Sequence, residues 1–501
     1  MSLPQSYSPE LNLQLLKPAF RAFVLGYLTT TGPRIVSFLA ALRRRDLSYE
    51  QKARQVFRIF GSALRWDRFP AFCALLAGGT CVLPALTASI LKAVFNGHRS
   101  KKPLQLSPQL LRLVRFISIF ISALTCFQIL NRKGRPESKL LKSSNVEQAT
   151  RQNAPDGSLD KPTADTTTRP ELAGRTLDLS LFAATRSVDL IVNFAWARLK
   201  RSKHIPTRFQ PIIPVVADTG VFATSAAIVM WAWFYVPERL PSAYSKWISE
   251  AAQVDSRLIE ALRTARRGDW TYGRNKGDRI VLEEMCDDYG WPRVWGDTSR
   301  TIPIPCEMVH MGCGPNCEKH AIWRFITAFK FAASTYLPLQ VALRWRSRSV
   351  AAYIAAIKSA IRSSTFLGLF VSLFYYSVCL ARTRLGPKLI SAKRVSPMMW
   401  DSGLCVGAGC LMCGWSIFVE SAQKRQEIAL FVAPRAAAAI FPRQYDRKYL
   451  WRENLMFSLS TAIILSCIHE DPTMVRGVLG RLLHRVFRIS DSKRSIDLPL
   501  L

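Results

Sequence analysis

The residues with the clearest potential for chemistry lie in one short polar stretch of the chain. Five cysteines and histidines fall within fifteen residues, in the order Cys306, His310, Cys313, Cys317 and His320. Thiolate and imidazole groups at short spacings are the ligands that zinc favours in tetrahedral sites. Because the spacing is not that of a standard zinc finger, two other interpretations stay open: one disulfide, or thiols that pack a small subdomain.

Motifs of the common enzyme classes are missing from the sequence. It contains no Walker phosphate loop, dinucleotide fingerprint, nucleophile elbow or paired-histidine motif of metalloproteases. Four charged residues do occur inside or beside apolar runs, namely Arg186, Asp189, Asp218 and Lys330. In lipid such groups either form structural pairs or mark a substrate route, and we expect structural roles here. The sequence assigns no catalytic residue and predicts a protein that is not an enzyme.

The rest of the chain is dominated by apolar stretches with basic residues at their ends, as expected for helices that span about 30 Å of hydrocarbon. We predict about six spans, and at most about ten. The candidates are Pro70–Phe95, Leu110–Leu130, Ile212–Val236, Phe325–Leu343, Thr365–Leu380, Met398–Val419 and Leu455–Ile468. Glycines in Met398–Val419 give it a face suited to close helix packing.

The strong positive charge has a membrane explanation. The chain carries 69 Lys and Arg and a net charge of +34, yet 49% of its residues are hydrophobic. A nucleic-acid-binding protein would gather its basic residues on one surface with a known binding motif, and neither feature is present. We therefore expect no nucleic acid as a partner, but a lipid bilayer with anionic headgroups. Membrane protein partners or a homo-oligomer are further possibilities.

The cysteines and the N-terminal residues bear on the cellular compartment. Most of the twelve cysteines lie in apolar runs, where they behave as small hydrophobes, so a reducing intracellular membrane is expected. Residues 1–14 match neither a secretory signal nor an Arg-rich transit peptide. Delivery to an organelle is therefore expected to use internal signals.

An imperfect internal repeat organises the chain. Three pairs of segments recur in the same order: Ser62–Arg65 with Ser359–Arg362, Leu181–Arg186 with Leu430–Arg435, and Ser225–Pro237 with Ser460–Pro472. They predict two related halves, over about residues 18–240 and 324–485. The alternative is chance similarity between apolar helices.

The predicted parts follow from this repeat and from composition. Residues 1–130 hold the first membrane helices, 131–176 a disordered polar linker inserted into the first half, 177–240 the rest of that half, 241–323 a small polar Cys/His-rich middle segment, 324–485 the second membrane half, and 486–501 a basic tail. The predicted fold class is all-α, a multi-pass helical membrane protein.

The Cys/His-rich segment and the repeats also carry a resemblance to a known family. The cluster of Cys306, His310 and Cys317, followed by an apolar helix with Tyr336-Leu337-Pro338-Leu339, resembles the cysteine-rich region of the transmembrane protein 135 family. Leu430–Arg435 is similar to that family's later half, and the membrane part is distantly similar to the translocases that import proteins into mitochondria. Met311 and Asn316 depart from the family pattern, which has Pro and Ser at those positions.

The resemblance implies a function and a location. It implies a multi-pass protein of peroxisomal or mitochondrial membranes, linked to organelle dynamics, membrane organisation or lipid homeostasis, and no established enzymatic activity. Two alternatives stay open. The first is a secondary transporter or channel for a lipid or metabolite, since many transporters are built from paired repeats. The second is a zinc-dependent membrane enzyme.

Overall fold

The protein is almost entirely helical. A computed structural model describes residues 9–42, 49–96, 107–132, 172–202, 205–274, 279–344, 349–390, 394–471 and 474–487. Within these ranges the only sheet is a two-stranded antiparallel ladder of β1 (Leu172–Ala173) and β2 (Tyr445–Asp446). The all-α prediction is therefore confirmed. Most of the predicted linker over 131–176 and most of the predicted tail over 486–501 lie outside the described residues.

Five helical segments in the described part of the chain are long and apolar enough to cross a membrane. They are Phe69–Thr87 in α3 (Phe69–Asn96), Pro108–Leu130 (α4), Ile212–Tyr235 (α7), Val350–Arg384, which contains α13 (Val350–Cys379), and Pro397–Val419, which contains α15 (Pro397–Met399) and α16 (Cys405–Cys413). Each overlaps a predicted span. The predicted spans Phe325–Leu343 and Leu455–Ile468 are helical, within α12 (Cys317–Ala342) and α18 (Leu450–Glu470), but are not among the five. These apolar helices support an integral membrane protein.

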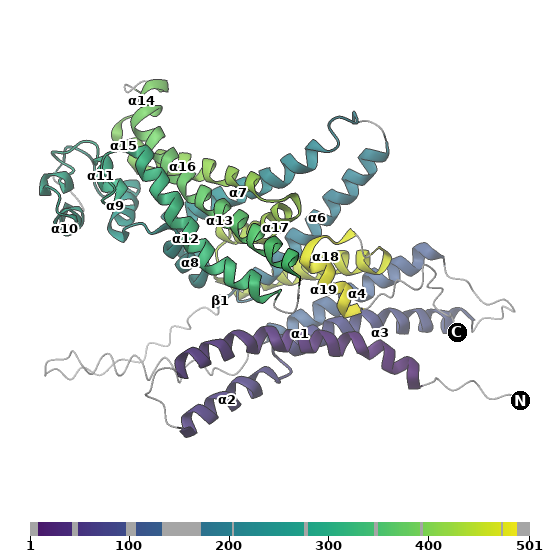
Figure 1. Ribbon diagram of the computed structural model, residues 1–501. Coiled ribbons are helices and arrows are strands. Elements are labelled where there is room, and N and C mark those ends of the chain that lie inside the picture. The colour runs from purple at the N-terminus through teal and green to yellow at the C-terminus, as the bar shows by residue number, and fades with distance from the viewer. Residues whose placement is uncertain are drawn as a thin grey trace, which may run out of the picture. The chain divides into compact units, whose positions relative to one another are not determined.

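The chain divides into two compact units, Met1–Phe194 with Gln444–Leu501, and Ala195–Arg443. The first contains α1 (Pro9–Leu42), α2 (Tyr49–Ala63), α3, α4, most of α6 (Leu177–Arg201), α18 and α19 (Gly477–Phe487). In it α3 packs against α1 and α4, and α4 packs against α18 (Figure 1). The ring of Phe127 on α4 stacks on Phe457 of α18 at 4.2 Å between centroids. Buried aromatic packing therefore joins helices that are more than 300 residues apart in sequence.

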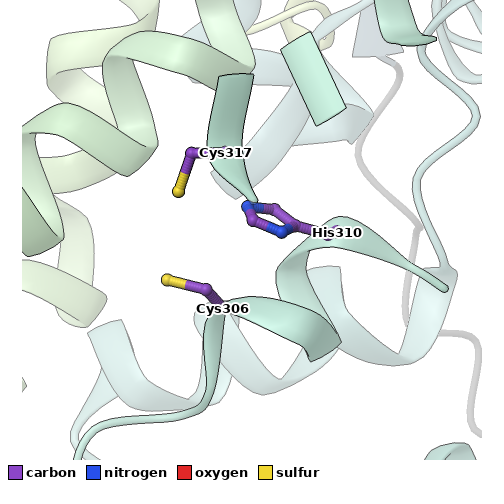
Figure 2. Close-up of side chains that lie close together, drawn as sticks. All are labelled: Cys306, His310 and Cys317. Carbon is purple, nitrogen blue, oxygen red and sulfur yellow. The ribbon is translucent and has the colours of Figure 1, made fainter. Parts of the chain in front are cut away.

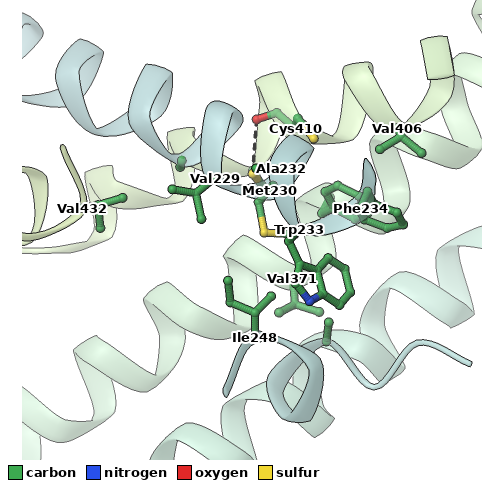
Figure 3. Packing of buried hydrophobic residues seen from close by; sticks show 14 of the residues in the cluster. Val229, Met230, Ala232, Trp233, Phe234, Ile248, Val371, Val406, Cys410 and Val432 are labelled. Carbon is green, nitrogen blue, oxygen red and sulfur yellow. Dashed lines mark hydrogen bonds between the residues drawn. The ribbon is translucent and has the colours of Figure 1, made fainter. Parts of the chain in front are cut away.

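The second unit is built around α13. This helix packs against α12 and α16, while α7 packs against α16 and α17 (Ala422–Ile440). Figure 3 shows the apolar core between these helices, where Phe234 lies among Met230, Val371 and Val406. The predicted role of glycine in close packing is confirmed at Gly414, where a Cβ atom would lie 2.5 Å from the Cα atom of Ala223 on α7. A larger residue at position 414 would push the two segments apart.

The predicted polar middle segment is a small helical subdomain of the second unit. It consists of α8 (Ser242–Ala252), α9 (Ser256–Arg267), α10 (Arg279–Tyr289) and α11 (Cys306–His310). The side chain of Asp255 caps α9 by accepting from the Arg257 amide at 2.9 Å, and Gly268 ends this helix in the left-handed region at φ 82°. Trp270, Leu282, Met285 and Met308 form a compact core of its own. The polar segment therefore folds, although it contains no apolar run.

The compact units are not divided where the predicted halves are. Helix α7 belongs to the first predicted half but packs with helices of the second. Helix α18 belongs to the second predicted half but packs in the first unit. The boundaries of the compact units therefore differ from those of the sequence repeat, and the repeat itself stays a prediction.

We expect the protein to remain in the membrane pellet after extraction with alkaline carbonate. Five apolar helices with satisfied backbone hydrogen bonds are stable in hydrocarbon, and their exposed side chains cannot be transferred to water without detergent. Immunoblotting of pellet and supernatant checks this result. A peripheral protein blotted in parallel should be released, and recovery of the chain with it in the supernatant would contradict membrane insertion.

Candidate metal centre

The first two residues of the candidate site are positioned by one short helix. Cys306 is the first residue of α11 and His310 is its last. A separation of four residues on a helix brings two side chains to the same face. The chain then reverses through Met311 at φ 50°, Gly312 at φ 86° and Gly314 at φ 84°. Two glycines in this turn adopt the left-handed region without a steric penalty. The turn therefore returns the chain to the face that carries Cys306 and His310.

A backbone hydrogen bond sets the orientation of the His310 ring. Its Nδ1 atom lies 2.7 Å from the carbonyl oxygen of Gly314 and donates to it, because a carbonyl oxygen can only accept. The remaining ring nitrogen, Nε2, then carries a lone pair. Metal-binding histidines are usually oriented in this way, with the second ring nitrogen donating to a carbonyl or carboxylate oxygen. The loop that connects α11 and α12 therefore leaves Nε2 of His310 free to bind a metal.

Cys317 completes a group of three convergent side chains. It is the first residue of α12, whose N-terminus is capped by the side chain of Asn316, which accepts from the Lys319 amide at 3.0 Å. The ligand atoms of Cys306, His310 and Cys317 all lie within 4.8 Å of one another. Figure 2 shows the two thiols and the imidazole pointing into a common space. His310 and Cys317 are buried and Cys306 is half-buried.

A fourth candidate ligand, Cys379, belongs to a helix that is distant from the cluster in sequence. Cys379 is the last residue of α13, and its side chain is almost fully buried. Its sulfur lies 3.4 Å from Nε2 of His310, the atom that carries the lone pair. The Cys379 thiol is also close enough to Cys317 and Cys306 to interact with them electrostatically. Cys379 therefore lies beside the group of three and contacts it through His310.

These distances can be compared with a bound zinc ion. Zinc–sulfur bonds of about 2.3 Å and zinc–nitrogen bonds of about 2.0 Å, at tetrahedral angles, place sulfur and nitrogen about 3.5 Å apart and two sulfurs about 3.8 Å apart. The observed 3.4 Å between His310 and Cys379 is close to the first value. The limit of 4.8 Å for the other three atoms is wider. A metal would shorten the distances between these three atoms by at most about 1.3 Å.

The other two predicted ligands are not in this group. Cys313 lies in the turn between α11 and α12, where its amide donates to the carbonyl oxygen of His310 at 3.3 Å. The ring of His320 stacks on that of His310 at 4.5 Å between centroids and contacts the edge of Tyr375. Its two ring nitrogens are buried and have no hydrogen-bond partner among the described residues. His320 therefore packs against the ligand His310, and the structure brings together three of the five predicted residues.

Burial controls the protonation of the site. Desolvation lowers the pKa of His310, and desolvation together with the charges of Arg324 and His310 lowers the pKa of His320 to about 3. Both imidazoles are therefore neutral at physiological pH, which is the form that binds metals. Desolvation raises the pKa of the Cys306 thiol, and the positive charge of Arg382 opposes this shift. A bound metal would favour the deprotonated form of Cys306, because thiolate is the form that coordinates metals.

A buried ion pair lies close to the metal ligands in sequence. Arg382, three residues after Cys379, lies in a π-helical turn and its Nη2 atom donates to Asp401 at 2.8 Å. Their side chains are only 5% and 2% exposed. The hydroxyl of Tyr272 donates to the same carboxylate at 2.5 Å and accepts from the amide of Ile304 at 3.0 Å. Asp401 thus links Arg382 to Tyr272 of the polar subdomain, and Tyr272 in turn binds Ile304, two residues before Cys306.

Two of the charged residues singled out in the sequence lie on α6, in the first unit. Arg186 is buried, with its guanidinium 5.4 Å from the ring centroid of Phe182. Asp189 accepts from the side chain of Asn193 at 3.0 Å. Both contacts join side chains one turn apart on the same helix. Local contacts of this kind are expected for residues with a structural role. Both residues are also far in sequence from the candidate metal ligands.

All twelve cysteines are free thiols, so the structure contains no disulfide in the polar subdomain. Cys306, His310 and Cys317 form a group that could hold a metal ion, and Cys379 lies next to it. Comparison of the chain with protein-family models, curated proteins and solved structures finds no match. The function must therefore be argued from the site and from the membrane helices.

Proposed function

We propose that the chain is a non-enzymatic, multi-pass protein of an organelle membrane, in which a structural zinc ion fastens the polar subdomain to the end of a membrane helix. Cys306, His310, Cys317 and Cys379 would hold the ion. The first three belong to the polar subdomain and its junction with α12, and the fourth ends α13. Zinc would therefore fix how the subdomain is held at the membrane surface.

The single observation that carries this proposal is the closed ligand set. Catalytic zinc usually has three protein ligands and leaves one position open for water or substrate, whereas structural zinc has four protein ligands. Here the lone pair of His310 faces Cys379, so the position that water would take in an enzyme is filled by a thiol. This arrangement argues against the zinc-dependent membrane enzyme and supports a structural role.

Metal analysis tests the proposal on the purified full-length protein. We expect about one zinc ion per chain, with an X-ray absorption spectrum that fits three sulfur neighbours at about 2.3 Å and one nitrogen neighbour at about 2.0 Å. Four protein ligands also predict no coordinated water. A metal-free protein whose thiols are all labelled by a maleimide reagent would contradict the proposal, and so would a spectrum with an oxygen neighbour in place of one sulfur.

The location and cellular role rest on the resemblance to the transmembrane protein 135 family. It implies a peroxisomal or mitochondrial membrane and a role in membrane organisation, organelle dynamics or lipid homeostasis. Imaging of the tagged full-length protein against markers for both organelles tests the location. Signal confined to the endoplasmic reticulum or plasma membrane would contradict it.

Two related membrane halves are also part of this proposal. The packing order α1–α3–α4–α18 in the first unit resembles the order α12–α13–α16–α7 in the second. Each order uses three helices of one predicted half and then the last long helix of the other, α18 or α7. We therefore propose that the two halves are structural repeats that have exchanged their last membrane helices, which would explain why the compact units and the sequence repeat have different boundaries.

A further inference from the structure

Helix α2 has a wide apolar face, and only part of it is covered within the protein. Ala63 is buried and Val56 and Ile59 are half-buried on the side that faces α1. The hydroxyl of Ser62 accepts from Arg34 of α1 at 3.2 Å, which fixes this contact. Figure 1 shows α2 alongside the second half of α1, which contains Arg34. The contact with α1 thus accounts for one side of the apolar face.

The uncovered side of the helix carries large apolar residues. Phe57 is 81% exposed and Phe60 is 39% exposed, and Leu64, directly after the helix, is 58% exposed. These positions follow one another by three and four residues, so they lie along one stripe. Two aromatic side chains that face water would be unfavourable in a soluble protein. Tyr27 of α1 covers part of Phe60, at 6.5 Å between ring centroids, and the rest of the stripe stays exposed and needs a partner.

Two further features identify the chemistry of that partner. Arg54 and Arg58, one turn apart on α2, are both exposed and border the apolar stripe. Only five residues separate the end of α2 from Phe69, where the first candidate membrane span begins. One of them is Trp66, which is 63% exposed. Tryptophan is enriched where membrane helices enter the headgroup region. The stripe thus ends close to the point where the chain enters the first candidate membrane span.

We propose that α2 lies in the plane of the membrane surface, with Phe57, Phe60 and Leu64 among the acyl chains and with Arg54 and Arg58 bound to anionic lipid headgroups. An amphipathic helix with arginines beside aromatic residues has the features of an interfacial helix. The position of α2 beside a membrane span makes its stripe continuous with the lipid-facing surface. The inference depends on α3 crossing the membrane, and it is independent of the metal centre.

Hydrogen exchange of the full-length protein in lipid nanodiscs tests this proposal. We compare nanodiscs of pure phosphatidylcholine with nanodiscs in which about one lipid in four is phosphatidylserine. Peptides from α2 should exchange more slowly in the anionic nanodiscs. In the variant Arg54→Gln/Arg58→Gln this protection should fall by about thirtyfold, since two arginines near an anionic surface contribute about 2 kcal/mol together. Added salt should weaken the protection in the native protein.

A second variant separates the apolar contribution from the charge. Phe57→Ser/Phe60→Ser should accelerate exchange of α2 in both kinds of nanodisc, because the aromatic side chains enter the acyl region whatever the headgroup. Peptides from Phe69–Thr87 serve as the internal control, and their unchanged protection shows that both variants are inserted. Equal exchange of native α2 in the two lipids would overturn the assignment of anionic headgroups. Protection that rises with the number of chains per nanodisc would overturn the proposal in favour of a second copy as the partner.

Discussion

We expect the Cys379→Ser variant to lose nearly all of its zinc, from about one ion per chain to less than about one-fifth of that value. The serine hydroxyl keeps the size of the side chain but cannot supply a thiolate. Position 379 lies 62 residues along the chain from Cys317, the nearest of the other ligands in sequence. Three remaining ligands would leave an open position in a site built for four. Elemental analysis of the protein after gel filtration in detergent measures this loss.

Two matched variants make the result specific. Cys410, in α16, is 2% exposed, against 3% for Cys379, and it is not among the four proposed ligands. Cys410→Ser therefore reports the cost of burying a hydroxyl in a membrane helix. Cys313→Ser removes a thiol of the polar subdomain that is also outside the proposed ligand set. Both should retain about one zinc per chain. Loss of zinc from Cys313→Ser, with retention in Cys379→Ser, would instead favour the ligand set predicted from sequence spacing.

The membrane helices could be predicted because their signal is local. A helix in lipid needs about twenty apolar residues in sequence, and composition within such a window is read directly from the chain. Phe69–Thr87 and Ile212–Tyr235 illustrate this. Segments Phe325–Leu343 and Leu455–Ile468 give a weaker signal, because their helices also carry charged residues. Helix α12 contains Lys319, Arg324 and Lys330.

The candidate metal centre was only partly predictable from the sequence. Cys306, His310 and Cys317 lie within twelve residues, so their spacing alone identifies them as candidate ligands. Cys379 occurs in an apolar run, where a cysteine normally behaves as a small hydrophobe. Its role depends on the packing of α13 against α12, a contact between helices that no spacing rule supplies. Its position at the end of the helix is the one signal that could have identified it.

The two predicted ligands outside the group show why spacing is insufficient. Cys313 is near His310 in sequence and lies in the turn through Gly312 and Gly314. In this turn the amide of Cys313, and not its thiol, contacts His310. His320 lies one helical turn after Cys317, yet its ring is taken up by stacking on His310. Which side chains converge therefore depends on the left-handed turn and on ring stacking, and both are properties of the folded chain that sequence spacing does not predict.

The buried ion pair of Arg382 and Asp401 leads to the second large prediction. We expect Asp401→Ala to destabilise the protein by about 3 to 5 kcal/mol, because it leaves a buried guanidinium without its counter-charge. The same substitution removes the acceptor for the Tyr272 hydroxyl. Thermal unfolding of the detergent-purified protein measures the change.

A double variant and an exposed pair distinguish lost pairing from general damage. Arg382→Met/Asp401→Leu removes both charges and fills their space with apolar atoms, so it should recover most of the stability that Asp401→Ala loses, since replacing a buried pair by hydrophobic residues is often neutral. Asp269→Asn breaks the pair of Arg267 and Asp269, whose side chains are 59% and 51% exposed, and should leave the unfolding temperature nearly unchanged. If the double variant is no more stable than Asp401→Ala, the charge of Arg382 is not the cause of the loss. The Tyr272 hydroxyl, which also accepts from the amide of Ile304, would then be the group whose lost partner matters, and Tyr272→Phe should reproduce the defect.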